Sequence, residues 1–269
     1  MSDTRPIGIF DSGMGGLTVV KEVIRSLPNE KIVYFGDTAR VPYGPKSKET
    51  IIRFSIENIL FLLKNNVKLI IVACNTASSV ALAAIEKNFK VPIMGVIEPG
   101  VSEAARITKN KRIGIIGTKT TVKSSAYEQQ LIKIDSKIKV FSIACPLFVP
   151  LVEEGWLKTK ITQQIVADYL MPLKNKNIDT IILGCTHYPL LKSVIQEVLG
   201  RKVHLVDSAR QVAYGAKQIL EEQGLLTNRE KTARQSVCFY VSDEPDNFAE
   251  QGEKFLGFAL NKVRKVSNV

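Results

Sequence analysis

Short apolar runs alternate with longer amphipathic stretches along most of the chain. The runs are short enough for buried strands, and they occupy residues 6–10, 31–35, 68–73, 91–96, 112–118, 137–143, 180–183, 203–206 and 237–241. Helical spacing of apolar residues is clearest at residues 49–65, 76–88, 160–173 and 247–260, and a polar linker is expected around residues 227–234. Strand alternating with helix predicts parallel sheets with helices on both faces.

The pattern contains a weak internal repeat. Residues 113–118, Ile-Gly-Ile-Ile-Gly-Thr, match Ile-Gly-Ile-Phe-Asp-Ser at residues 7–12 position for position. An apolar run that ends on a cysteine follows each copy, and these cysteines are Cys74 and Cys185. The repeat predicts an α/β protein with two similar lobes.

Polar residues gather where these predicted strands end. Ligands of parallel α/β sheets bind at the carboxyl ends of the strands, and Asp11, Cys74, Thr118 and Cys185 all fall at that edge. Two lobes with these edges facing each other would enclose one ligand between them.

The candidate chemistry rests on two of the four cysteines. Cys74 and Cys185 lie among polar residues at strand ends, whereas we interpret Cys145 and Cys238 as small packed hydrophobic residues. A thiol with an unperturbed pKa of about 8.5 can accept or donate a proton at moderate cost. One thiolate and one thiol on opposite faces of a carbon can therefore invert a stereocentre. His187 beside Cys185 keeps a Cys–His hydrolase open as a rival.

The composition limits the class of protein that the chain can be. The 269 residues are 45% hydrophobic and 23% charged, which is ordinary for a globular protein. No apolar run approaches the roughly 18 residues of a membrane span, and the first residues lack an apolar signal region, so we expect a cytoplasmic protein. Zinc-type ligand spacing is absent, and His187 and His204 are the only histidines, so we expect no metal site.

The formal net charge of +11 is compatible with nucleic-acid affinity or with a solvated basic surface. The basic residues are scattered, and no motif of the common nucleic-acid modules appears, so we expect no specific nucleic-acid partner. The glycine turn at residues 11–16 is neither a Walker A loop nor a clean Gly-x-Gly-x-x-Gly. Asp11 at the strand tip would also repel a phosphate.

Four motifs together resemble the glutamate racemase family. They are Asp11-Ser12-Gly13-Met14-Gly15-Gly16, Pro42-Tyr43-Gly44, Cys74-Asn75-Thr76 and Gly184-Cys185-Thr186-His187-Tyr188-Pro189. The resemblance runs from about Pro6 to Leu220, and no diagnostic motif lies past about Asn228.

The resemblance implies two doubly wound α/β lobes, one of residues 1–98 plus 208–269 and one of residues 99–207, with the active site between them. It implies interconversion of L- and D-glutamate without pyridoxal phosphate or metal, for peptidoglycan synthesis, by an enzyme that is often a homodimer. Cys74 would take the proton from D-glutamate and Cys185 from L-glutamate. Asp11 would assist Cys74, and His187 would assist Cys185 together with Glu153 or its neighbour Glu154. The substrate-binding residues would be Asp11, Ser12, Tyr43, Gly44, Asn75, Thr76, Thr118, Thr121, Thr186 and His187.

Two other functions stay open on the sequence. One is a related two-cysteine racemase that acts on aspartate or a hydantoin. The other is a non-catalytic two-lobed protein that binds an amino acid, although a binding protein would not need a thiol on each side of its ligand.

Overall fold

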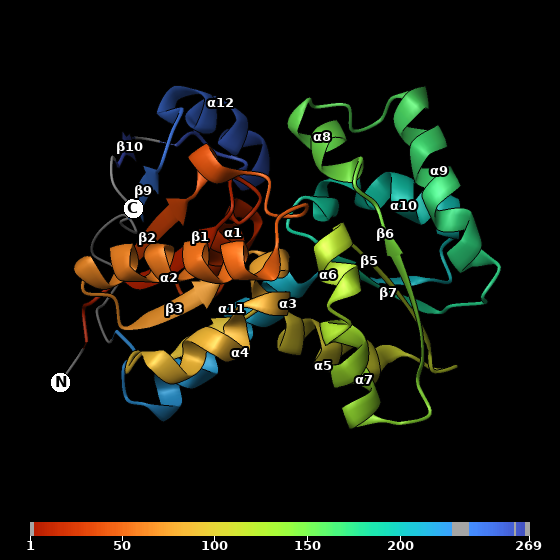
Figure 1. Ribbon diagram of the computed structural model, residues 1–269, viewed down its shortest axis with the longest axis horizontal. Helices are drawn as coiled ribbons and strands as arrows, with labels where there is room; N and C mark the ends of the chain where they lie inside the picture. The colour runs from red at the N-terminus through yellow and green to blue at the C-terminus, as the bar shows by residue number, and fades with distance from the viewer. Residues whose placement is uncertain (1–2, 228–236, 261, 267–269) are drawn as a thin grey trace.

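The computed structural model describes residues 3–227, 237–260 and 262–266. Their strands form two parallel sheets, and the two resulting lobes lie side by side in Figure 1. The strand orders are β10-β9-β2-β1-β3-β4 in the first sheet and β6-β5-β7-β8 in the second. The two-lobed α/β fold predicted from the sequence is confirmed.

The first sheet combines strands from both ends of the chain. It contains β1 (Ile7–Asp11), β2 (Ile32–Gly36), β3 (Leu69–Val72), β4 (Ile93–Gly95), β9 (Val237–Val241) and β10 (Val263–Lys265). Every residue of β1, β2 and β3 is buried, which explains why these strands are almost continuously apolar rather than alternating. Their carboxyl ends carry Asp11, Asp37 and Cys74 to one edge of the sheet.

The second sheet repeats this arrangement with strands from the middle of the chain. It contains β5 (Arg112–Gly117), β6 (Lys139–Ala144), β7 (Thr180–Gly184) and β8 (His204–Val206). In the register of β5 and β7, Gly117 pairs with Gly184. Thr118 and Cys185 therefore leave adjacent strands at the same level.

Helices cover both sheets. The helices up to residue 199 are α1 (Leu17–Ser26), α2 (Lys48–Lys64), α3 (Asn75–Val80), α4 (Leu82–Ile85), α5 (Ile97–Ile107), α6 (Lys119–Lys123), α7 (Ala126–Ile134), α8 (Phe148–Glu153), α9 (Lys160–Lys174) and α10 (Lys192–Leu199). The last two are α11 (Ser208–Glu222) and α12 (Pro245–Leu256), and the 3-10 turns are η1 (Thr38–Arg40), η2 (Glu86–Asn88) and η3 (Tyr188–Leu191). Figure 1 shows α3, α5, α6 and α11 near the junction of the lobes.

Three details differ from the sequence expectations. The helix expected at residues 76–88 is divided into α3, α4 and η2, with the breaks at Ala81 and Glu86. The last helix ends at Leu256, because Gly257 adopts a left-handed φ of 84°. The basic tail contains β10, which the sequence did not indicate. The linker expected around residues 227–234 lies outside the described residues after Thr227.

Candidate active site

Cys74 lies where β3 passes into α3. Its side chain caps α3 and accepts a hydrogen bond from the Ala77 N–H at 3.5 Å, while the Ser12 hydroxyl lies 3.7 Å from the sulfur. The thiol is buried, with a residue exposure of 5%. Burial, reinforced by the negative charge of Asp11, raises the pKa of Cys74 to about 12 despite the two hydrogen bonds. Cys74 is therefore protonated at neutral pH in the substrate-free protein.

Cys185 occupies the matching position after β7, with different neighbours. Its sulfur lies 3.8 Å from His187 Nδ1, and His187 Nε2 lies 3.0 Å from Glu153 Oε1. Glu153 is the last residue of α8, whereas Glu154 is exposed and has no such contact. Burial lowers the pKa of His187, but its hydrogen bonds to Cys185 and Glu153 outweigh burial and raise it to about 10.

Asp11 is the acidic residue of the first strand end and is fully buried. Its Oδ2 accepts from the Gly13 N–H at 3.0 Å, whereas Oδ1 has no hydrogen-bond partner in the described part of the chain. Burial raises the pKa of Asp11, and the positive charge of His187 opposes that rise. Asp11 and His187 come from different lobes, so the two thiol environments meet between the sheets.

The glycine turn after β1 touches the second lobe directly. A Cβ on Gly15 would lie 2.2 Å from Thr186 Oγ1 and 2.5 Å from His187 Nδ1, so only glycine fits this approach. The Thr18 hydroxyl also contacts the Thr186 carbonyl at 3.3 Å. The function of the glycine turn is thus close packing between lobes, and it places Asp11 near His187.

Three threonine hydroxyls form a cluster across the junction. Thr76 Oγ1 lies 3.0 Å from Thr118 Oγ1 and 3.3 Å from Thr121 Oγ1, and the latter two lie 3.0 Å apart. Thr76 comes from α3 of the first lobe, and the other two come from the turn into α6 of the second. The cluster lies at the first turn of α3, the helix that Cys74 caps.

Two residues predicted to bind substrate direct their side chains at protein partners. Asn75 Nδ2 donates to the Tyr127 hydroxyl at 2.7 Å. The buried Tyr43 hydroxyl donates to Asp37 and accepts from Asn58 Nδ2 at 3.1 Å. The loop that carries Tyr43 nevertheless reaches the second lobe, because the Gly44 carbonyl accepts from Thr120 Oγ1 at 2.8 Å.

The structure adds residues that the sequence reasoning missed. Asp37 is fully buried at the end of β2 and binds the Arg40 guanidinium at 2.7 Å, which fixes the loop that follows. Its strand-end position, which matches that of Asp11, was an available signal. Phe255 of α12 packs its ring on His187, and nothing in the sequence pattern linked these two residues.

A cavity of about 1190 Å³ lies among α3, α4, α5, α7 and α11, and it contains none of the residues predicted for the site. No group of three or more His, Cys, Asp and Glu side chains is arranged to hold a metal ion in the described part of the chain. Among the described helices, none is long and apolar enough to cross a membrane.

The fold and site together define a two-lobed α/β protein with a buried cysteine at a strand end of each lobe. The chain matches the family model described as Asp/Glu/Hydantoin racemase over residues 7–213. The chain belongs to this family.

Individual relatives cover nearly the whole chain. A glutamate racemase of Geobacter metallireducens is 49% identical over 263 residues, which are 98% of this chain and 97% of that protein. The crystal structure of glutamate racemase isoform RacE1 from Bacillus anthracis superposes with a TM-score of 0.94 at 40% identity, covering 98% of both chains. That of the Francisella tularensis enzyme in complex with D-glutamate has a TM-score of 0.92 at 41% identity, again over 98% of both chains.

Proposed function

We propose that the protein interconverts L- and D-glutamate with Cys74 and Cys185 as its two bases and without pyridoxal phosphate or metal. The observation that carries this proposal is the pair of buried strand-end thiols, one from each lobe, with the charge of Asp11 acting on Cys74 and the imidazole of His187 lying 3.8 Å from Cys185. The match to glutamate racemases over nearly the whole chain supports glutamate as substrate, and the D-glutamate complex of the Francisella enzyme supports the same substrate class.

Each direction of the reaction uses the thiols in opposite roles. From L-glutamate, the Cys185 thiolate removes the Cα proton, and the Cys74 thiol delivers its own proton to the opposite face. From D-glutamate, the Cys74 thiolate removes the proton and the Cys185 thiol delivers one. The raised pKa of Cys74 favours the thiol form that the first direction requires. His187 and Glu153 assist at Cys185, and Asp11 assists at Cys74.

The buried Oδ1 of Asp11 supplies a reason for substrate orientation. A buried acceptor without a hydrogen bond costs about 1–3 kcal/mol, so the ammonium group of glutamate gains by donating to it. That ammonium would also offset the negative charge that raises the pKa of Cys74. The carboxylates of the substrate then meet the hydroxyls and backbone N–H groups of the remaining residues, which are Ser12, Tyr43, Gly44, Asn75, Thr76, Thr118, Thr121 and Thr186.

Carbanion-like charge at Cα requires preorganised donors in a site closed to water. The threonine cluster and the N-termini of α1, α3 and α6 provide donors, and both sulfurs are buried between the lobes. The proposed lobes are residues 1–98 plus 208–269 and residues 99–207, so an opening between them would admit the substrate.

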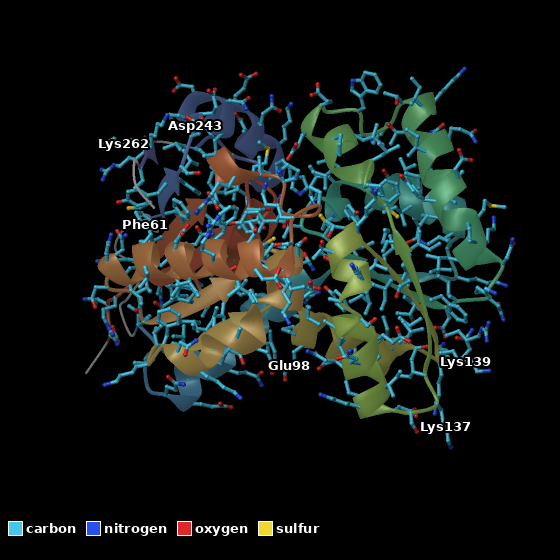
Figure 2. All side chains as sticks on the ribbon, in the orientation of Figure 1. Phe61, Glu98, Lys137, Lys139, Asp243 and Lys262 are labelled. Carbon is cyan, nitrogen blue, oxygen red and sulfur yellow. The ribbon has the colours of Figure 1, made fainter. Side chains whose placement is uncertain are left out.

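The cellular setting is part of the same proposal. The protein acts in the cytoplasm as a homodimer and supplies D-glutamate for peptidoglycan, without a specific nucleic-acid partner. Figure 2 shows Lys137 and Lys139 at the outer end of the second lobe, away from the junction of the lobes. Both lysines are exposed, which fits a solvated basic surface better than a binding site.

The test is an assay of racemisation in which circular dichroism monitors the reaction, with chelator present and no added pyridoxal phosphate. We expect conversion of L- and D-glutamate in preference to aspartate and hydantoins. In heavy water, the product should carry deuterium at Cα while the remaining substrate stays protiated at early times. Replacement of Cys74 or Cys185 alone by alanine should stop racemisation. If the starting enantiomer gained deuterium at early times as fast as product formed, one base would serve both faces. That result would overturn the two-thiol proposal.

A further inference from the structure

Four groups contact the His187 side chain, and two of them come from the other lobe. Its own lobe supplies Cys185 at Nδ1, 3.8 Å away, and Glu153 at Nε2, 3.0 Å away. The first lobe supplies the backbone of Gly15 and the ring of Phe255. His187 is 4% exposed, so its imidazole is held within the protein, and these four groups are in contact with it.

Phe255 belongs to the C-terminal part of the chain. It lies on α12, which follows β9 of the first sheet and packs on α1. The centroid of its ring is 5.5 Å from that of His187, and the ring planes are nearly perpendicular at 87°, a favourable edge-to-face arrangement. The matched family model ends at residue 213, so this contact comes from outside the region that defines the family.

The hydrogen bonds of His187 are poor tethers by themselves. The contact of Nδ1 with sulfur is long, and a small tilt of the ring would break it. Glu153 is the last residue of α8, and 34% of its side chain is exposed, so its carboxylate is held by fewer neighbours than a buried one would be. Phe255 is 3% exposed and packed in the core with Leu256 and Phe248, which makes it a stiff wall.

We propose that Phe255 is a positioning residue for racemisation, which holds the His187 imidazole from the opposite lobe with Nδ1 directed at Cys185. This inference rests on the proposed function, because it assigns His187 to the Cys185 half of a two-thiol reaction. The groups that transfer the proton at Cys185 are then fully in place only when the two lobes are closed on each other. The direct hydrogen-bond partners of Cys74 are Ser12 and Ala77, both in the first lobe, so this contact does not position Cys74 itself.

Replacement of Phe255 by leucine removes the aromatic wall while keeping an apolar side chain. Because the two enantiomers have equal free energy, kcat/KM must fall equally in both directions, and we expect a loss of about 10-fold, a fraction of what general acid–base assistance contributes. The side of the defect is visible in isotope effects measured with substrates deuterated at Cα. Slower proton transfer at Cys185 makes that step more rate-limiting. The isotope effect with L-glutamate, which loses its Cα deuteron to Cys185, should therefore rise. The isotope effect with D-glutamate, which loses its Cα deuteron to Cys74, should fall.

The matched control is Leu256→Ala, the neighbouring residue on α12, which is 1% exposed and lies in the same core. It should lower the thermal midpoint at least as much as Phe255→Leu while leaving the two isotope effects near their wild-type values. A Phe255→Met variant keeps the experiment informative where the leucine variant does not fold, and it should shift the isotope effects in the same opposed directions.

The imidazole signals provide a readout that does not depend on turnover. The chain has two histidines, and the exposed His204 serves as the internal reference for His187. We expect the His187 ring protons to move in the Phe255 variants, through loss of the aromatic ring current, while those of His204 stay in place. Isotope effects that change together, or that match those of Leu256→Ala, would overturn the positioning role. Failure of the wild-type protein to racemise glutamate would instead overturn the proposed function.

Discussion

Replacement of Glu153 by glutamine should lower the pKa of His187 and remove part of the stability of the folded protein. The carboxylate lies 3.0 Å from His187 Nε2, and its negative charge is one of the causes that raise the pKa of the imidazole to about 10. Glutamine keeps the shape and an acceptor oxygen but loses the charge. The perturbation is therefore electrostatic.

The magnitude follows from distance and exposure. An opposite charge within hydrogen-bond distance shifts a pKa by about 1–3 units, and the partial exposure of Glu153, 34% of its side chain, places it at the low end, about 1 unit. One unit corresponds to about 1.4 kcal/mol. A raised folded-state pKa stabilises the protein below the unfolded value of about 6.5 and loses its effect as pH rises through the folded value. The difference between wild type and Glu153→Gln should thus persist to about pH 9 and vanish above about pH 10.

The assay is denaturant unfolding at about pH 7 and about pH 11, combined with a pH titration of the two histidine signals. Glu154→Gln is the matched control, because it removes the same charge from the adjacent exposed position. It should leave both the His187 titration and the stability nearly unchanged. A stability difference that is equal at the two pH values, or an equal effect of the two substitutions, would refute the assignment of Glu153 as the partner of His187.

Three other substitutions test separate parts of the structure. Gly15→Ala should reduce kcat/KM by at least about 100-fold, because its Cβ meets groups 2.2 and 2.5 Å away, whereas Gly13→Ala, whose nearest contact is 3.5 Å, should be mild in the same racemisation assay. Lys68→Met should cost about 3–5 kcal/mol in urea unfolding, because it removes a fully buried ammonium from a buried carboxylate 2.6 Å away, yet kcat/KM should be retained. Asp11→Asn should lower the pKa of Cys74, seen as alkylation of that thiol at lower pH, and an unchanged alkylation profile would contradict the charge coupling.

The architecture was predictable because its signals are local. Continuous apolar runs become strands buried on both faces, and the strand–helix alternation leaves a parallel sheet as the simple outcome. The strand β10 carried no such signal, because Arg264 and Lys265 are exposed on a three-residue edge strand. Its position depends on pairing with β9, which is a tertiary contact.

The same distinction applies to the site. Cys74, Cys185 and Asp11 could be proposed as site residues from the sequence because each lies at the end of a strand, and strand ends of a parallel sheet meet at one edge. The sequence left Glu153 and Glu154 equivalent, since the choice depends on which carboxylate the end of α8 turns toward His187. The contact of Phe255 with His187 could not be predicted for the same reason, because it joins residues 68 positions apart on different lobes.

The internal repeat explains why the two thiols are alike, and the junction of the lobes explains why their surroundings are not. Both cysteines follow an interior strand and are buried, Cys74 as the N-cap of α3 and Cys185 directly after β7. Cys74 faces the negative charge of Asp11, whereas Cys185 faces the imidazole of His187. The raised pKa of Cys74 favours its thiol form, whereas Cys185 has an imidazole nitrogen within hydrogen-bonding distance. The positive charge of His187 also opposes the rise in the pKa of Asp11, so the two halves of the site interact across the junction of the lobes.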